Sequence, residues 1–136
     1  MKIMAIDLGD ARTGIAFSDP SGSIVGETFV ENSRSPEKLM DRLCELAAEK
    51  KADKIVMGLP LNMDGSEGER AQKCRGAAAE LARRSGMEVI LQDERRTTVD
   101  AHRILSEMGK ATKKHRKNVD AVAASLILET YLNRRT

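Results

Sequence analysis

Apolar residues follow two patterns along this chain: short dense runs, and stripes that recur every three or four positions. Dense runs bounded by Gly, Pro or Asp are typical of buried strands. They predict five strands, at residues 2–9, 14–18, 24–30, 53–57 and 87–91. The first run, Lys2-Ile3-Met4-Ala5-Ile6-Asp7-Leu8-Gly9, carries a single carboxylate, Asp7, within an otherwise apolar stretch.

Stripes with helical spacing predict four helices. Their start signals are an N-cap Ser35 followed by Pro36, a capping box of Ser66 and Glu69, Thr97 with Asp100, and an N-cap Asn118. The last helix is expected to bury Val119, Val122, Ala123, Leu126 and Ile127.

The lengths of the connections predict how the strands pair. Short turns between the first three strands, including Asp19-Pro20-Ser21-Gly22, imply an antiparallel meander. A helix precedes the fourth strand, which favours parallel pairing with the first. We therefore expect one α/β domain, residues 1–136, with a mixed five-stranded sheet, helices on both faces and functional groups at the carboxyl ends of the parallel strands.

Composition excludes several classes of protein. The 136 residues are 32% charged with a net charge of +2, which is ordinary for a globular domain. Cys44 and Cys74 lie in separate helical stripes without clustered ligands, so we interpret both as reduced, apolar residues. No leader peptide and no segment of membrane-spanning length is apparent, and we expect a cytoplasmic protein.

Three carboxylates stand where such a sheet would gather them at one edge: Asp7 on the first strand, Glu94 just past the fifth, and Asp120 in the first turn of the last helix. Carboxylates from separate elements make a hard-oxygen site for Mg²⁺ or Mn²⁺, and two such ions about 4 Å apart can promote phosphodiester hydrolysis. Each acid also has a purely structural explanation. Asp7 could hydrogen-bond the following turn, Asp120 could complement a helix dipole, and Glu94 could pair with a neighbouring arginine.

A cluster of basic residues precedes Asp120 between Lys110 and Lys117. We expect a basic loop there that binds phosphates, although a solvated surface segment would have the same composition. The candidate nucleic-acid contacts are Arg12, Arg95, Arg96, Lys113, Lys114, Arg116 and Lys117.

Other chemistry has little support. The three aromatic residues, Phe17, Phe29 and Tyr131, lie in apolar patterns, so a base-stacking platform is disfavoured. The chain has no P-loop and no Ser/His/Asp grouping. If the protein binds nucleic acid, it does so through the phosphate backbone.

Five motifs together resemble the YqgF/RuvX family, in the right order and along the whole chain. They are Ile6-Asp7-Leu8-Gly9, Arg12-Thr13-Gly14-Ile15-Ala16, Gly58-Leu59-Pro60-Leu61-Asn62, Asp93-Glu94-Arg95-Arg96-Thr97-Thr98 and Val119-Asp120-Ala121-Val122-Ala123-Ala124.

The resemblance implies an RNase H-like fold and a divalent-metal nuclease, with Asp7, Glu94 and Asp120 as its catalytic and metal-binding acids. Members of the family are described as Holliday junction resolvases and as nucleases that mature the 5′ end of pre-16S rRNA. RuvC-type resolvases carry an acid directly after the fourth strand, where this chain has Gly58-Leu59-Pro60-Leu61, so Glu94 would take that role.

Several alternatives stay open from the sequence. The substrate could be structured rRNA precursor or branched DNA, and the protein a monomer or a homodimer. Retention of the fold for non-catalytic nucleic-acid or ribosome binding is a third possibility. The N-terminal motif also resembles the phosphate-binding hairpin of actin-like ATPases, which need two such domains to enclose a nucleotide.

Overall fold

The computed structural model describes residues 1–93 and 112–134, with the backbone only for 112–120. The strands are β1 (Ile3–Asp7), β2 (Arg12–Ser18), β3 (Val25–Asn32), β4 (Lys54–Leu59) and β5 (Val89–Asp93). The helices are α1 (Pro36–Glu49), α2 (Glu69–Ser85) and α4 (Thr112–Arg134). The helix predicted after Thr97 falls outside the described residues.

The five strands form one mixed sheet in the order β3-β2-β1-β4-β5. β1, β2 and β3 pair antiparallel, whereas β1 pairs parallel with β4 and β4 parallel with β5. The fold class, the meander and the parallel pairing predicted from the sequence are confirmed. Gly22, with φ of 73°, donates its N–H to the carbonyl of Asp19 and closes the predicted turn between β2 and β3.

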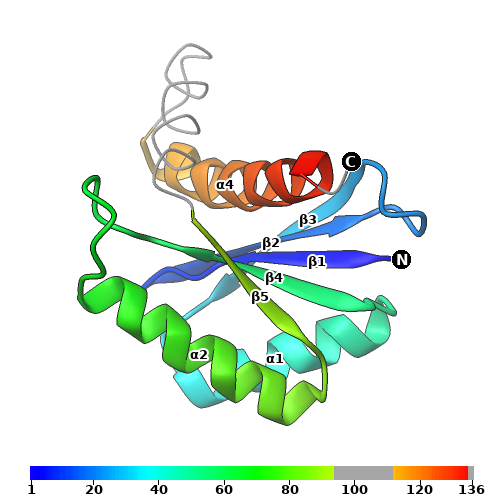
Figure 1. Ribbon diagram of the computed structural model, residues 1–136, viewed down its shortest axis with the longest axis horizontal. Coiled ribbons are helices and arrows are strands. Elements are labelled where there is room, and N and C mark those ends of the chain that lie inside the picture. The colour runs from blue at the N-terminus through cyan, green and yellow to red at the C-terminus, as the bar shows by residue number, and fades with distance from the viewer. Residues whose placement is uncertain (94–111, 135–136) are drawn as a thin grey trace.

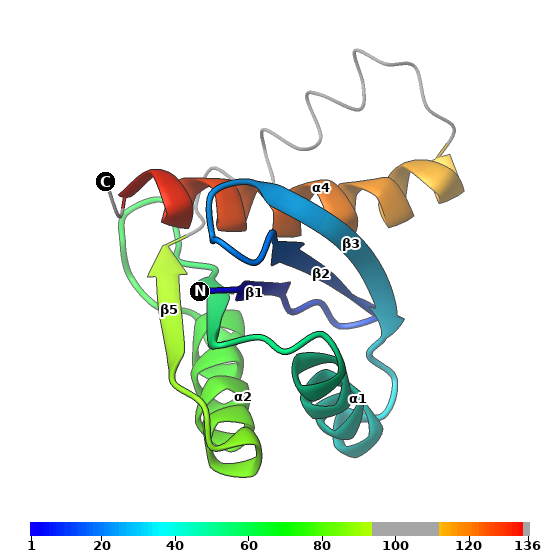
Figure 2. The same ribbon diagram turned by 90° about the vertical axis from the view of Figure 1, so that its right-hand side faces the viewer.

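Helices cover both faces of the sheet (Figure 1). α1 and α2 lie on one face, and α4 crosses the other, as the perpendicular view in Figure 2 also shows. Side chains alternate along β1 accordingly. Met4 and Ile6 pack in the core under α1 and α2, whereas Ile3 and Ala5 pack against α4.

The core also contains the two cysteines and the aromatic residues. Cys74 is buried, Cys44 is half-buried against the same cluster, and the two do not form a disulfide. Phe17 is fully buried and meets Phe29 edge-on, with 6.0 Å between the ring centroids. Tyr131 packs against the α4 cluster. The aromatic side chains are therefore used for packing, as predicted.

Charged side chains join α1 to α2. Arg84 of α2 donates to Asp41 at 3.0 Å and to Glu37 at 2.6 Å, both on α1, and to Glu80 of its own helix at 2.7 Å. These contacts raise the pKa of Arg84, and hydrogen bonds from Arg83 and Arg84 lower the pKa of Glu80 to about 2. These ion pairs therefore link α1 and α2 on one face of the sheet.

Two predictions about helix starts are wrong. The predicted basic loop is helical from Thr112, because lysine and arginine are good helix formers and neither Gly nor Pro interrupts residues 112–118. The predicted capping box does not form, and Gly68 is the N-cap of α2. Ser66 instead bonds within the preceding loop, where its N–H and hydroxyl both donate to Oδ1 of Asp64.

Three smaller differences concern element ends and stripes. β5 extends two residues beyond the predicted strand, to Asp93. Ser35 is the N-cap of α1, but its side chain makes no capping hydrogen bond. On α4, Ala123, Ala124, Ile127 and Leu128 are fully buried, whereas Leu126 is only half-buried.

Candidate active site

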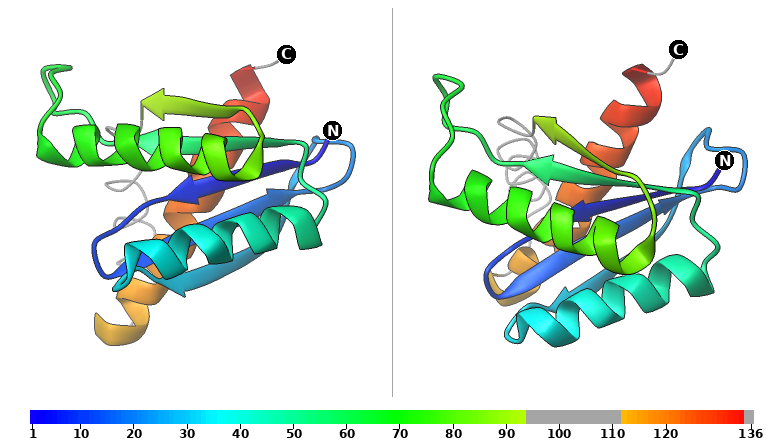
Figure 3. Two further views of the ribbon diagram at one scale, coloured as in Figure 1. Left: turned by 90° about the horizontal axis from the view of Figure 1, so that it is seen from below. Right: turned by 60° about the horizontal axis from the view of Figure 1, so that its bottom comes forward.

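The parallel strands β1, β4 and β5 all end at the same edge of the sheet, which we call the carboxyl edge (Figure 3). β2 begins and β3 ends at this edge as well, because both are antiparallel to their neighbours. In the chain, α1 comes after β3 and α2 comes after β4, so the segments that lead into both helices leave the sheet at this edge. Open α/β sheets commonly bind ligands at such an edge.

Asp7 is the last residue of β1 and is half-buried at the carboxyl edge. The alternation along β1 places it with Ile3 and Ala5 on the α4 face of the sheet. In β2 its partner is Gly14, and the next strand, β4, carries Gly58 one residue beyond the Ile6–Met57 pair. A carboxylate thus sits beside two glycines, which add no side chain of their own.

Gln92 fixes α4 against this face. Its side chain is 4% exposed, and Nε2 donates to the carbonyl oxygen of Ile127 at 2.9 Å. A buried amide needs such a partner, since an unpaired one costs about 1 to 3 kcal/mol. The bond ties β5 to α4 at the residue that lies across from Gly58.

Asp120 lies in α4, three and four residues before the buried Ala123 and Ala124. Helical spacing therefore puts position 120 on the stripe that faces the sheet. The side chain of Asp120 lies outside the described residues, and so does Glu94, which follows the last residue of β5. Within residues 1–93 and 121–134, no three His, Cys, Asp or Glu side chains gather closely enough to hold a metal ion.

Of the predicted nucleic-acid contacts, Arg12 is described in full. It opens β2 at the carboxyl edge, opposite Asn32 of β3. Lys113, Lys114, Arg116 and Lys117 lie in the first turns of α4, where the backbone alone is described. Arg95 and Arg96 fall outside the described residues.

The turn after Asp7 has features that the sequence did not indicate. A Cβ atom on Gly9 would lie 2.2 Å from the carbonyl oxygen of Arg12, so the chain reverses tightly only with glycine there. Lys73 of α2 donates to Asp10 at 3.0 Å, and this hydrogen bond lowers the pKa of Asp10. A contact between residues 63 positions apart has no signature in the pattern of either segment.

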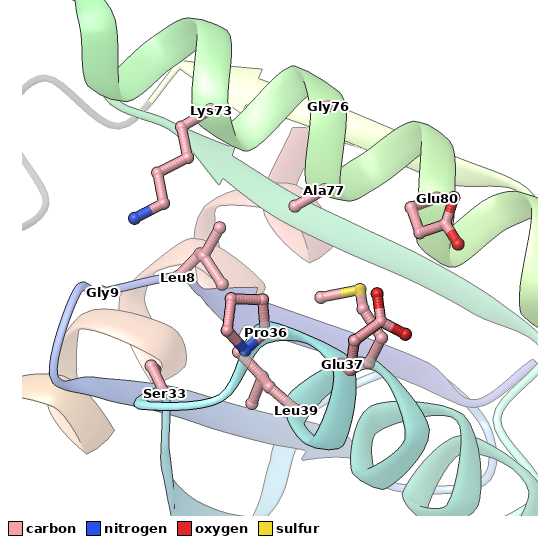
Figure 4. Close-up of a pocket in the computed structure, with 11 residues that line it drawn as sticks. Leu8, Gly9, Ser33, Pro36, Glu37, Leu39, Lys73, Gly76, Ala77 and Glu80 are labelled. Atoms are coloured by element: carbon pink, nitrogen blue, oxygen red, sulfur yellow. The ribbon is translucent and has the colours of Figure 1, made fainter.

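A cavity of about 270 Å³ lies beside this turn, between α1 and α2 (Figure 4). It is on the face of the sheet opposite α4, and its walls are mainly apolar, with Leu8, Pro36 and Ala77 among them. Gly76 of α2 also lines the cavity, and a Cβ atom added there would have no neighbour within 4 Å. No described neighbour therefore requires glycine at this mid-helix position.

We expect Gly76→Ala to stabilise the protein by about 0.5–1 kcal/mol, because alanine restricts the unfolded chain and fits the open space. Urea unfolding monitored by circular dichroism measures the change. Gly86→Ala is the matched control on the same helix. Gly86 ends α2 with φ of 71°, so its replacement should destabilise by about 1–2 kcal/mol. Shifts of the same sign in both variants would contradict this account of α2.

No helix among the described residues has the length and apolar content needed to cross a membrane.

Sequence comparisons find close relatives along the whole chain. The family model described as "RuvX: Holliday junction resolvase" matches residues 1–134. A Pelotomaculum thermopropionicum protein named "Putative pre-16S rRNA nuclease" is 40% identical over 134 residues, covering 98% of this chain and 87% of its own. A Streptococcus gordonii protein of the same name is 41% identical over 137 residues, covering 98% and 99%.

Solved structures with this fold include two Holliday junction resolvases. Fowlpox virus resolvase, solved with junction DNA, aligns with a TM-score of 0.64 and 11% identity over 99% of both chains. RuvC of T. thermophilus, solved with a Holliday junction substrate, aligns with a TM-score of 0.59 and 16% identity, covering 99% of this chain and 96% of RuvC. The fold is the RNase H-like resolvase fold predicted from the five motifs, and the protein belongs to the RuvX family.

Proposed function

We propose that this protein is a divalent-metal-dependent nuclease that hydrolyses phosphodiester bonds at the carboxyl edge, acting in 5′-end maturation of pre-16S rRNA. The observation that carries the proposal is the position of Asp7, a half-buried carboxylate on the α4 face beside Gly14. Partial burial of a charge is costly unless the charge is compensated, and coordination of a metal ion is one form of compensation, which supports a metal-binding role for this carboxylate. The names of the curated relatives supply the substrate.

Asp7, Glu94 and Asp120 would hold the ions. Asp7 offers the hard carboxylate oxygens that Mg²⁺ and Mn²⁺ prefer, which supports these metals as the ions of the site. Glu94 follows β5 directly, and helical spacing places position 120 on the sheet-facing stripe of α4. When bound, one or two ions would activate a water molecule and stabilise the leaving oxygen.

The remaining groups would position the substrate. Arg12 at the start of β2 would hold phosphates at the same edge, together with Arg95, Arg96 and the basic first turns of α4. Such contacts fix the register of a nucleic acid without reading its sequence. The bond from Gln92 to Ile127 keeps α4 at a fixed position over β5.

Resolution of branched DNA is the second candidate, favoured by the description of the family model. The segment after β4 supports it less well. Leu59-Pro60-Leu61 carries no acid, and the first carboxylate of the loop, Asp64, accepts two hydrogen bonds from Ser66. A non-catalytic binding module is the third candidate.

Incubating the purified protein with a pre-16S rRNA fragment and with a four-way DNA junction distinguishes the three. Each reaction is run with Mg²⁺, with Mn²⁺ and with a chelator. The proposal predicts metal-dependent cleavage of the RNA. Cleavage of the junction alone would support the resolvase, and binding of either substrate without cleavage would support the binding module.

Charge reversal of Lys113, Lys114 and Arg116 to glutamate should weaken nucleic-acid binding. Each lost phosphate contact reduces the magnitude of the negative slope of log affinity against log salt by about 0.7–0.9. Because acidic residues are favourable near a helix N-terminus, the triple variant should fold at least as stably as the wild type. Fluorescence anisotropy at several salt concentrations measures the slope, and an unchanged slope would place the binding surface elsewhere.

A further inference from the structure

A second group of cations lies at the carboxyl edge, on the side of β1 away from β4 and β5. β3 ends at Asn32, and the chain passes through Ser33, Arg34 and Ser35 into α1. Two shallow hollows, of about 350 and 320 Å³, border this segment and share Arg34. Arg12 lines the first hollow and Lys38 the second.

The segment that carries Arg34 is fixed to β2. The N–H of Ser33 donates to the carbonyl oxygen of Ala11 at 3.0 Å, and the hydroxyls of Ser33 and Thr13 form a buried hydrogen bond of 2.6 Å. The N–H of Arg34 donates to the Asn32 side chain at 2.8 Å. The guanidinium of Arg34 therefore extends from an anchored backbone rather than from a long loop.

Arg34 and Lys38 form no ion pair within the described residues. Most cations of α1 and α2 form ion pairs, such as Arg75 with Glu67. Among the side chains of residues 1–93 and 121–134, no carboxylate lies within 4 Å of Arg34 or Lys38. The one acid that lines both hollows, Glu31, is already paired with Arg42 at 3.1 Å. The hollows thus carry a net positive charge.

Strand geometry gives the reach from this group to Asp7. Asp7 pairs with Gly14, and Arg12, two residues nearer the edge, pairs with Asn32 on the next strand. With strands about 4.8 Å apart and a rise of about 3.3 Å per residue, the backbone of Asn32 lies roughly 12 Å from that of Asp7. Measured along the axis of a duplex, one strand places roughly three to four phosphates over that distance.

We propose that Arg12, Arg34 and Lys38 form a phosphate-binding track that guides the substrate strand away from Asp7, past the end of β3 and along the start of α1. The substrate would then be held on two sides of the site, by this track and by the basic turns of α4. The proposal rests on the proposed function for its substrate, a nucleic acid. It assigns two binding residues, Arg34 and Lys38, that no motif of the sequence indicates.

The test compares Arg34→Gln/Lys38→Gln with Lys51→Gln, each combined with Asp7→Asn to prevent cleavage. Lys51 is an exposed cation at the other end of α1, which makes it a matched control. A fluorescent RNA stem-loop and a four-way DNA junction serve as probes, and anisotropy is measured between 50 and 400 mM NaCl. Loss of two contacts should reduce the magnitude of the slope of log affinity against log salt by about 1.4–1.8, and the affinity by roughly 25- to 60-fold at 0.1 M salt.

An unchanged slope in the double variant, a slope that falls equally in Lys51→Gln, or no binding of either probe by the Asp7→Asn protein would overturn the track. The outcome is separable from the proposed function. If the wild type cleaves RNA and the slope does not move, the track alone fails. If the slope falls but the wild type cleaves neither probe, the track stands and the nuclease proposal fails.

Discussion

Asp7→Asn is expected to reduce the rate of phosphodiester cleavage by about a thousandfold or more, which corresponds to ~4 kcal/mol of lost transition-state stabilisation. Asparagine has nearly the same shape as aspartate but lacks its negative charge, so it holds a divalent ion poorly. Because Asp7 is the half-buried last residue of its strand, the neutral side chain should leave the fold intact. Initial cleavage rates and thermal unfolding of the same preparations measure both effects.

Asp10→Asn is the matched control for this variant. Asp10 lies three residues further along the same turn, but it is exposed and hydrogen-bonded to Lys73. We expect its replacement to leave the cleavage rate within a few-fold of the wild type. A wild-type rate in Asp7→Asn, or an equal loss in both variants, would show that Asp7 is not a metal-binding residue.

Gly9→Ala is expected to destabilise the protein by about 1–3 kcal/mol and to lower cleavage as well. The added Cβ would lie 2.2 Å from the carbonyl oxygen of Arg12, and a backbone atom cannot move aside as a side chain can. The turn must therefore open, which shifts both Asp7 and Arg12 at the carboxyl edge. Urea unfolding and cleavage rates measure the two effects.

The contrast with Gly76→Ala makes this prediction specific. The same chemical change is made in both variants, but at position 76 the Cβ atom enters open space. Opposite signs are therefore expected for the two changes in unfolding free energy. An unchanged unfolding midpoint in Gly9→Ala would mean that the turn adapts without cost.

Much of the fold could be predicted because its strands are dense apolar runs with clear ends. The β1 run alternates between two packed faces, so it is apolar throughout, and its short link to β2 leaves antiparallel pairing as the simple solution. The start of α4 was missed for a physical reason. A run of lysines and arginines has no apolar stripe, so its helical propensity is hidden when helices are identified by hydrophobic spacing.

Part of the candidate site could be predicted. Asp7 is a candidate from the sequence alone because a carboxylate in a buried strand is unusual. Gln92 is not, because a neutral polar residue after an apolar run resembles the start of a loop, and only packing against α4 shows that its amide is buried. The close approach of Gly9 to Arg12 cannot be read from the sequence either, because it arises only in the folded chain. The same holds for the grouping of Arg34 and Lys38 around the two hollows.

We expect Asp7, Glu94 and Asp120 to bind the same metal ion. Titration of Mn²⁺ into the wild type and into Asp7→Asn, Glu94→Gln and Asp120→Asn, followed by calorimetry and by electron paramagnetic resonance, measures the contribution of each acid. We predict that the wild type binds Mn²⁺ and that each single variant binds it at least about tenfold more weakly, since each loses one charged ligand. Wild-type affinity in either Glu94→Gln or Asp120→Asn would contradict the shared site.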